Sequence, residues 1–390
     1  MSTTKVVVSQ TSIMSAQEAG LFLGRDIADK LDGDAPDVLI VFASPECSYE
    51  PLLKALHEAC SPNMLVGCSS AGEFSGCHTA SSSVSVMAIR SDDMIFQSAL
   101  GRNVSASRTD AVTALQPAFI GKDYPAYPFR SALVLSDLLA GYADDLIHEI
   151  TVRTGGMYQL FGGGAADDAK FHKTHVFCGH QAISDAVVVL GIHSRKPLGI
   201  GVKHGWVATG RPLRVTEAEG LRVISLNAAA AGDAFEQHAI DNGAVFKRQD
   251  PLPYFLQNVI GIETGDGYKL RVPLSLNADG SITCASEVPV GATVHIMSTS
   301  AESASEAARH AAEAAIKGLQ GEALAGSLVF DCAATRLRLG EGFRDELKSI
   351  ADTLGSENFA GCNTYGQIAR AEGQFNGFHN CTAIVCAIPK

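Results

Sequence analysis

The stretch VGCSSAGEFSG, residues 66–76, and the stretch AGCNTYGQI, residues 360–368, share one order of apolar, glycine and small polar residues. Each ends a longer segment that consists of an apolar run, an amphipathic run, a second apolar run and a glycine-rich turn. A weaker third copy occupies residues 131–168 and ends in FGGGAADD. Because a pattern that recurs in one order indicates duplication, we predict three related strand–helix–strand units. The expected strand-end glycines are Gly67, Gly162 and Gly361.

The apolar runs predict strands, and the segments between them predict helices. Another apolar run follows each turn, at residues 84–89, 186–192 and 382–388. Such short runs bounded by turn residues are typical of strands buried on both faces. Residues 200–300 are interpreted mostly as short strands, with NADG at 277–280 as a hairpin turn. The fold class we expect is α/β, a mixed α+β arrangement built from repeated strand–helix–strand units, glycine-rich strand-end turns and mixed sheets.

The sequence also indicates a domain boundary and two helix starts. We place the boundary near residues 194–198, which gives two domains, 1–197 and 198–390. SAQE at residues 15–18 and SASE at residues 303–306 have the spacing of a capping box. In that motif a Ser and a Glu side chain each satisfy a backbone N–H group that the first helical turn leaves free. We therefore expect a helix to begin at each.

The composition is that of an ordinary globular protein, since 46% of the 390 residues are apolar and 18% are charged. The formal net charge of −12 argues against nonspecific binding to nucleic acid or to anionic membranes. The sequence has neither a spanning apolar run nor the pattern of a signal peptide. Its ten cysteines are scattered without a C-x-x-C pair. We interpret them as reduced thiols of a cytoplasmic protein, mostly in the core.

The glycine-rich turns do not match the nucleotide-binding or hydrolase motifs. A P-loop needs a Lys that these turns lack, and Asp167 stands where a Rossmann turn needs its third glycine. GCSSAG is one residue too long for the serine turn G-x-S-x-G. Cys68 and Cys362 hold equivalent positions, where either a nucleophile or a small packing residue would fit. We favour packing, because no base can be assigned to either cysteine. The sequence also lacks the spacing of a structural zinc site.

One histidine stands out by its neighbours. GVKHGW places His204, Gly205 and the single tryptophan, Trp206, in a row, and Arg211 follows. One interpretation is a histidine at a strand end that bonds to the backbone. The other is a ligand to a flat apolar group, with the glycine allowing close approach and the tryptophan offering an apolar face.

Taken together, these motifs resemble the FIST proteins. The resemblance rests on VGCSSAGEF with its following strand, on GVKHGW…RPLRVTEAEG, on AGCNTYGQIA…FNGFHNCTAIVCAI, and on their order. It covers nearly the whole chain and implies a FIST N-terminal sensory domain, 1–197, and a FIST C-terminal domain, 198–390. FIST domains are regarded as small-ligand sensors in bacterial signal transduction, fused to or beside histidine kinases and diguanylate cyclases. Because no kinase or cyclase segment is present, the chain is similar to the stand-alone members.

One branch of stand-alone FIST proteins binds haem and senses nitric oxide, and the resemblance implies the same here. The implied cofactor is haem b, with His204 as the iron ligand and Arg211 meeting a propionate. The cofactor site would consist of His204, Trp206, Arg211 and His238. His238, on the expected helix AGDAFEQHAI, is the second choice of ligand, and His295 is the third.

The expected function is therefore a cytoplasmic nitric-oxide sensor, not an enzyme. It would regulate a partner histidine kinase, diguanylate cyclase or phosphodiesterase in trans, without binding nucleic acid or membrane. The second hypothesis is a haem-free sensor of an amino acid or another small metabolite, with Arg211 or Arg370 holding a carboxylate. The third is an enzyme with a Cys or Ser nucleophile at a turn. A homodimer is compatible with each.

Overall fold

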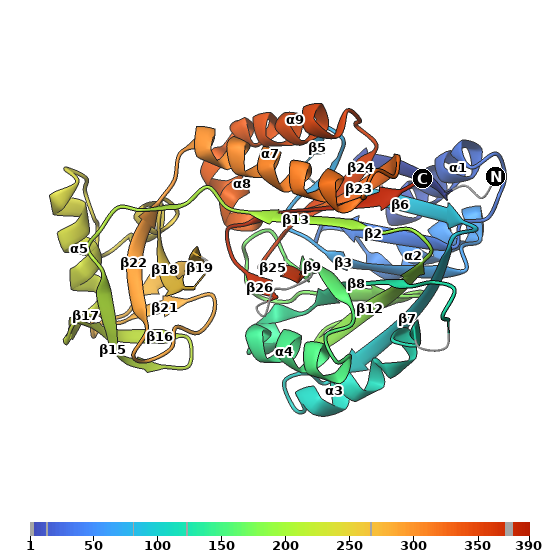
Figure 1. Cartoon of the computed structure of the whole chain (residues 1–390). Helices are drawn as coiled ribbons and strands as arrows, with labels where there is room; N and C mark the ends of the chain where they lie inside the picture. The colour runs from blue at the N-terminus through green and yellow to red at the C-terminus, as the bar shows by residue number, and fades with distance from the viewer. Residues whose placement is uncertain (1–3, 13–14, 81, 122–123, 266, 371–376) are drawn as a thin grey trace.

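Three units of the same construction make up most of the chain (Figure 1). Each unit centres on two parallel strands with one or two α-helices between them, and an antiparallel strand flanks each parallel pair. A smaller body, yellow to orange in Figure 1, lies beside the three units. This computed structural model describes residues 4–12, 15–80, 82–121, 124–265, 267–370 and 377–390.

The first unit begins with an edge strand and a capped helix. The predicted helix start at SAQE is confirmed, and the serine half of the capping box forms, because the Ser15 side chain accepts a hydrogen bond from the Glu18 N–H at 3.2 Å. The Glu18 carboxylate accepts from the Ser15 hydroxyl at 2.7 Å. All six residues of the central strand β2 are buried, as its continuous apolar run predicts. The elements are β1 (Thr4–Ser12), α1 (Ala16–Lys30), β2 (Val38–Ala43), α2 (Tyr49–Cys60), β3 (Met64–Ser69), β4 (Glu73–Ser75), β5 (His78–Ala80) and β6 (Ser83–Ser91).

The second unit repeats this order from Met94 to Ser194. Short 3-10 helices follow its first helix and its first parallel strand. The elements are β7 (Met94–Arg102), α3 (Arg108–Ala114), η1 (Gln116–Ala118), β8 (Phe129–Ser136), η3 (Leu138–Ala140), α4 (Ala143–Arg153), β9 (Gln159–Gly164), β10 (Val176–Cys178), β11 (Gln181–Ile183) and β12 (Ala186–Ser194).

The third unit contains two helices, α8 and α9, between its parallel strands. Its elements are β13 (Gly199–Lys203), α7 (Ala301–Gly318), β23 (Leu324–Cys332), α8 (Ala333–Leu339), η4 (Gly340–Gly342), α9 (Phe343–Leu354), β24 (Phe359–Thr364), β25 (Gln367–Arg370), β26 (Phe378–His379) and β27 (Ala383–Pro389).

The predicted start of the alanine-rich helix at Ser303 is wrong. Helix α7 begins at Ala301, and Ser300 is its cap. The Ser303 N–H donates to the Ser300 side chain at 3.1 Å, and the Ser300 N–H donates to the Ser303 side chain at 2.9 Å. A serine hydroxyl thus fills the role that we expected of Glu306, so the capping box lies one turn earlier.

The smaller body is an insertion between β13 and α7 of the third unit. The predicted NADG hairpin is confirmed, since β20 and β21 pair antiparallel across it. The predicted boundary at 197/198 falls between β12 and β13, where the third unit begins. The inserted elements are β14 (Val207–Ala208), β15 (Leu213–Glu219), β16 (Arg222–Leu226), β17 (Ala229–Ala230), α5 (Ala231–Asp241), α6 (Leu252–Phe255), β18 (Asn258–Thr264), β19 (Gly267–Arg271), β20 (Pro273–Leu276), β21 (Ile282–Cys284) and β22 (Thr293–Ser298).

Each unit contributes its short hairpin to the sheet of another unit. Hairpin β4–β5 of the first unit pairs with β24 of the third, and β25–β26 of the third pairs with β9 of the second. Hairpin β10–β11 of the second unit pairs with β3 of the first, which closes the cycle. Because each of these sheets takes a hairpin from a neighbour, the three units form one structure and cannot be separated at a linker.

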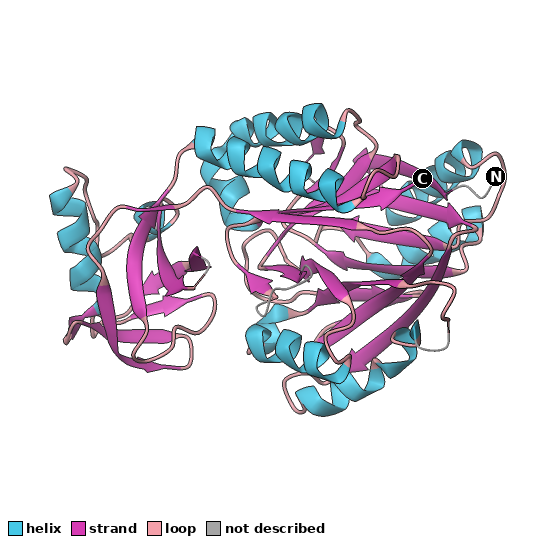
Figure 2. Ribbon diagram, viewed as in Figure 1, coloured by secondary structure: helices cyan, strands magenta, loops and turns pink. Residues whose placement is uncertain are grey.

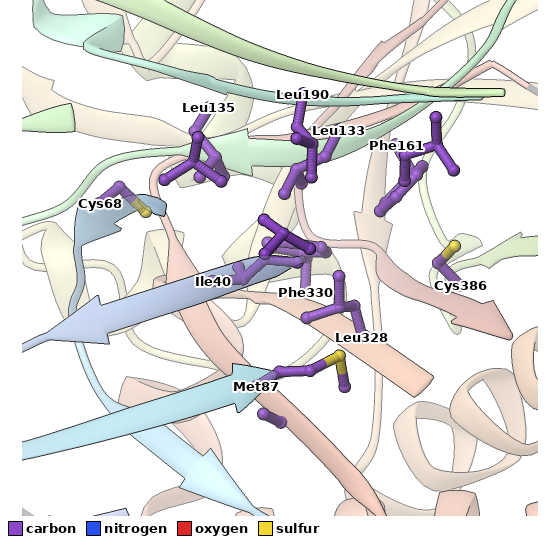
Figure 3. Close-up of a cluster of buried hydrophobic side chains, with 14 of the residues drawn as sticks. Ile40, Cys68, Met87, Leu133, Leu135, Phe161, Leu190, Leu328, Phe330 and Cys386 are labelled. Atoms are coloured by element: carbon purple, nitrogen blue, oxygen red, sulfur yellow. The ribbon is translucent and has the colours of Figure 1, made fainter. Parts of the chain in front are cut away.

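The inward faces of the three sheets share one hydrophobic core (Figure 3). Ile40, Leu133 and Leu328, one from each unit, all lie within it, and the rings of Phe42 and Phe330 meet edge to face at 5.6 Å. Helices cover the outer faces, α1 and α2 on the first sheet, α3 and α4 on the second, α7 and α9 on the third (Figure 2). Within the described ranges, no helix is long and apolar enough to cross a membrane.

The predicted equivalence of the three strand-end glycines is confirmed. In each unit the glycine lies directly beside a valine of the parallel strand, and a Cβ on the glycine would overlap the valine carbonyl oxygen. The three pairs are Gly67 with Val41, Gly162 with Val134, and Gly361 with Val329. The close approach of the two backbones is therefore the reason for glycine at these positions.

We predict that Gly67→Ala lowers the free energy of unfolding by about 2–4 kcal/mol, because the new methyl group must displace a buried strand. Gly342→Ala is the matched control, since a Cβ there meets open space. Chemical denaturation followed by circular dichroism measures both. Equal stability of the two variants would contradict the close-approach explanation.

Candidate functional site

The three glycine-rich turns meet where the parallel strands end. Backbone hydrogen bonds of 2.9 to 3.2 Å link each turn to the next in a closed cycle, which we call the axial ring. Each bond runs from an N–H group of one turn to a carbonyl group of another. The bonds are Ala71 to Asn363, Tyr365 to Gly164, and Ala166 to Ser69. Because only main-chain groups are used, the ring tolerates different side chains in the three units.

A cavity of about 500 Å³, the axial cavity, lies outside this ring. Ala71 of the ring, the turn after β9, α8 and the start of α9 line it. It therefore lies beyond the carboxyl ends of the parallel strands, where open α/β sheets commonly bind their ligands.

The axial cavity presents both signs of charge. Its acidic lining residues are Asp168 and Glu341, and its basic ones are Arg336 and Arg344. Partial burial raises the pKa of Asp168, while the nearby Arg336 guanidinium acts in the opposite direction. Carboxylates accept hydrogen bonds and guanidinium groups donate them, so the cavity suits a small ligand that carries a negative and a positive group.

Arg336 owes its place to the first glycine-rich turn. Its guanidinium donates a hydrogen bond to the Ala71 carbonyl, and it lies so close to Gly72 that a Cβ there would overlap it. Gly72 also has φ of 141°, in the region that favours glycine. The turn therefore admits an arginine side chain to the axial cavity.

Glu73 is a buried acid directly behind this turn. Its side chain is 2% exposed and accepts hydrogen bonds from the hydroxyls of Ser70 and Ser83, the latter at 2.7 Å. Burial raises the pKa of Glu73 to about 7, although both hydroxyls favour the ionised form. In the third unit the equivalent position holds the neutral Gln367, whose side chain donates to the Thr364 hydroxyl at 3.0 Å.

Two family models match this chain. The FIST N domain model matches residues 37–229, and the FIST C domain model matches residues 233–370. The chain belongs to the FIST family. FIST domains are sensory domains of signal transduction, so this protein is a member of a sensory family.

Solved structures add little to this assignment. Two structures of cyanuric acid hydrolase, the first from A. caulinodans, align over 100% and 99% of this FIST protein and all of their own chains, at 9% identity and TM-scores of 0.35 and 0.38. PurL from T. maritima complexed with ADP aligns over 98% of this chain and 71% of its own, at 10% identity and a TM-score of 0.25. TM-scores this low support no conclusion about fold or function. No curated protein matches the chain.

His204 bonds to the backbone through both ring nitrogens. Nδ1 accepts from the Trp206 N–H at 3.3 Å, and Nε2 lies 3.3 Å from the Tyr268 carbonyl oxygen, to which it donates in that tautomer. Burial lowers the pKa of His204, which agrees with a neutral ring. Of the two interpretations that the sequence left open, this geometry matches the backbone-bonded histidine at a strand end.

The surroundings of His204 do not fit a haem. The cavity beside it has a volume of about 10 Å³, room for roughly one water molecule. Helix α7 occupies the space above Gly205, where a Cβ would overlap the Ser303 carbonyl. Trp206 is 6% exposed and packs into a buried cluster. The haem assignment stays a prediction, and these residues leave no space for a porphyrin.

The other predicted site residues lie apart from the axial cavity. Arg211 is exposed on the inserted body. His238 is buried, with Nδ1 2.8 Å from the Tyr254 hydroxyl and Nε2 3.0 Å from the Thr209 hydroxyl. Arg370 donates to two carbonyl groups of the second unit. In the described part of the chain, no group of three or more His, Cys, Asp or Glu side chains could hold a metal ion.

The structure places Cys68 and Cys362 in the common core. Both are fully buried, at equivalent positions one residue after the strand-end glycines. Burial raises the pKa of Cys362 well above its usual value, which argues against a reactive thiolate. This burial supports the interpretation as packing residues.

Sequence reasoning missed the residues that line the axial cavity. Arg336 and Arg344 lie on the α8–α9 segment, which we interpreted only as an amphipathic helix, and Asp168 was noted only as the last residue of the weaker repeat. One signal was available: the repeat that ends in AGCNTYGQI has extra residues between its first strand and its helix. Insertions at the carboxyl end of a parallel strand are where such folds carry function.

We predict that Glu73→Gln changes how stability depends on pH. The pKa of Glu73 is higher in the folded state, about 7, than the ordinary value of 4.5. The difference in the free energy of unfolding, wild type minus variant, should therefore be largest below pH 4.5 and should decrease as the pH rises to 7. A tenfold change in proton affinity corresponds to about 1.4 kcal/mol, so the wild type should lose about 3 kcal/mol of stability compared with the variant over this pH range.

Denaturant unfolding between pH 4.5 and pH 8 measures this difference. Glu58→Gln, at an exposed carboxylate, is the control and should follow the wild type. Parallel stability curves for the wild type and Glu73→Gln would show that Glu73 does not titrate as described.

Proposed function

We propose that this FIST protein senses a small zwitterionic molecule, such as an amino acid, that binds in the axial cavity. The observation that carries the proposal is that Arg336 and Asp168, from two different units, line the same cavity. Arg336 uses one N–H group on the Ala71 carbonyl, and a guanidinium has further donors for a carboxylate. The cavity volume also lies within the range of pockets that hold small molecules.

Helix α8 connects this cavity to the inserted body. Ala333, Arg336 and Leu337 lie on the face that lines the axial cavity, as helical spacing requires. Thr335 and Arg338 lie on the other face, toward Trp206 and the root of the insertion. A ligand that shifts the backbone of α8 at Arg336 therefore also shifts Arg338, because the seven residues of α8 form one short helix.

Arg338 is held between an aromatic ring and two acids. Its guanidinium carbon lies 5.7 Å from the centre of the Trp206 ring, and Asp331 and Glu346 line the same small cavity. Both acids are 2% exposed, and burial raises the pKa of each. Trp206 packs with Met297 and other residues of the insertion, so the position of Arg338 bears directly on that body.

A second contact ties the insertion to the second unit. Asp144, at the start of α4, forms ion pairs with Lys269 and Arg271 of β19. Arg271 is only 2% exposed, and its side chain also donates to the Glu287 and Leu270 carbonyls. In this proposal two contacts hold the insertion, one at Trp206 and one at Asp144. The ligand changes the relative strength of these two contacts and thus the position of the insertion.

The output of the sensor passes to a partner in trans. In our proposal the partner is a histidine kinase or an enzyme of cyclic-di-GMP metabolism, in keeping with the signalling role of FIST domains. A change in the position of the inserted body on the three units alters the surface that such a partner contacts. Nitric-oxide sensing through haem remains the alternative, and the lack of space beside His204 weighs against it.

We predict that Arg336→Gln weakens binding of a stabilising amino acid at least tenfold, since a charge-assisted hydrogen bond contributes about 1.5–3 kcal/mol. A thermal-shift screen of the twenty L-amino acids selects the ligand, and titration calorimetry measures its affinity. Arg309→Gln, an exposed arginine on α7, is the control and should bind as the wild type does. Unchanged binding by Arg336→Gln would refute the axial site. A haem Soret band that depends on His204, with no amino-acid binding, would favour the alternative.

A further inference from the structure

The second unit breaks the symmetry of the axial ring. In the first and third units, the turn passes into the next strand directly through Gly72 and Gly366. In the second unit, additional residues separate the ring residue Ala166 from β10, and they include residues 167–173, which we call the asymmetric loop. Two of its residues, Asp168 and Ala169, line the axial cavity.

The asymmetric loop has an unfavourable backbone conformation. Asp168, Ala169 and Phe171 have φ of 54°, 60° and 53°, in the left-handed region. Residues with a Cβ rarely adopt this region, and a bulky residue such as phenylalanine does so least readily. Such strain persists only where the surroundings enforce it, and it is concentrated at functional sites.

Asp167 accepts the hydrogen bonds that hold the loop in this conformation. Its carboxylate accepts hydrogen bonds from the N–H groups of Phe171, His172 and Lys173 at 2.8, 2.7 and 2.9 Å, and from the Tyr365 hydroxyl. Burial acts to raise the pKa of Asp167, but these four hydrogen bonds outweigh it and the pKa is lowered. The carboxylate is thus ionised, and each of its two oxygens accepts two hydrogen bonds.

An aromatic stack fixes the loop to the third unit. The rings of Phe171 and Tyr365 are 4.4 Å apart and nearly parallel, at 9°. Tyr365 is itself a residue of the axial ring, through its N–H to the Gly164 carbonyl. The loop is therefore anchored on the ring, and Asp168 is held at the edge of the axial cavity that contains Arg336.

We infer that the asymmetric loop sets the specificity of the axial cavity, with Asp168 binding the protonated amine of a ligand whose carboxylate Arg336 holds. Asp167 is the positioning residue, because it acts only by holding the loop. This inference rests on the proposed function and adds to it the group that discriminates between ligands.

The chemistry of Asp168 explains why amines are selected. An ionised carboxylate only accepts hydrogen bonds, so it pairs well with an ammonium group and has nothing to donate to a second carboxylate. Asp168 is exposed, so a ligand that lacks the amine leaves it to water and forgoes its attraction, while a dicarboxylate adds repulsion between like charges. The cavity should therefore bind simple carboxylic acids of the same size and shape more weakly than the amino acids.

Titration calorimetry on the full chain tests this inference with matched probes. The pairs are L-alanine and propionate, L-leucine and 4-methylpentanoate, L-phenylalanine and 3-phenylpropanoate, and L-glutamate and glutarate. The wild type should prefer the amino acid of the best-binding pair by about tenfold or more. Asp168→Asn should bring the two members of that pair within about threefold, because it removes the charge that selects the amine.

Two further variants separate recognition from structure. Asp167→Asn should lose the same preference although Asp168 is intact, since the loop is no longer held. Glu58→Gln, at an exposed acid outside the cavity, should keep the preference. The inference is overturned, and the proposed function stands, if the wild type binds amino acids while Asp168→Asn keeps the preference or Glu58→Gln loses it. If the wild type binds neither member of any pair, both fail.

Discussion

The close approach of two backbones at each strand-end glycine is the constraint on which the rest of the structure depends. Gly67, Gly162 and Gly361 bring each parallel strand against the carbonyl of a valine on its neighbour. Each parallel pair ends two or three residues beyond its glycine, and the three turns that follow bond to one another there. The axial ring, the exchanged hairpins and the common core all follow from three strand pairs that end at the same place.

Pseudo-symmetry of the fold produces a site that is not symmetric. Three equivalent turns form the ring, but different additions surround it: the asymmetric loop in the second unit and α8 in the third. The loop brings Asp168 and the helix brings Arg336, while the first unit contributes Gly72, which leaves room for the arginine. A single small ligand can thus contact all three units, and this explains how it could influence the insertion that the third unit carries.

The fold was largely predictable from the sequence, and the site was not. The repeats were recognisable because a glycine without space for a Cβ recurs in the same local pattern. The exchanged hairpins were not, because pairing between units leaves no local signal. The same holds for the axial cavity, where Asp168 and Arg336 are distant in sequence and neither belongs to a motif. His204 was prominent for its neighbours Gly205 and Trp206, and the structure uses that group to pack the root of the insertion.

Hydrogen–deuterium exchange, with and without the amino acid that stabilises the protein most, tests the central claim most directly. We predict slower exchange in two sets of segments, one at the axial cavity and one where the insertion contacts α8 and the second unit. The first comprises residues 69–72, 165–169 and 333–341, and the second comprises residues 204–208 and 268–272. Protection of the cavity segments alone would contradict the coupling through α8. Protection confined to other parts of the chain would contradict the axial site itself.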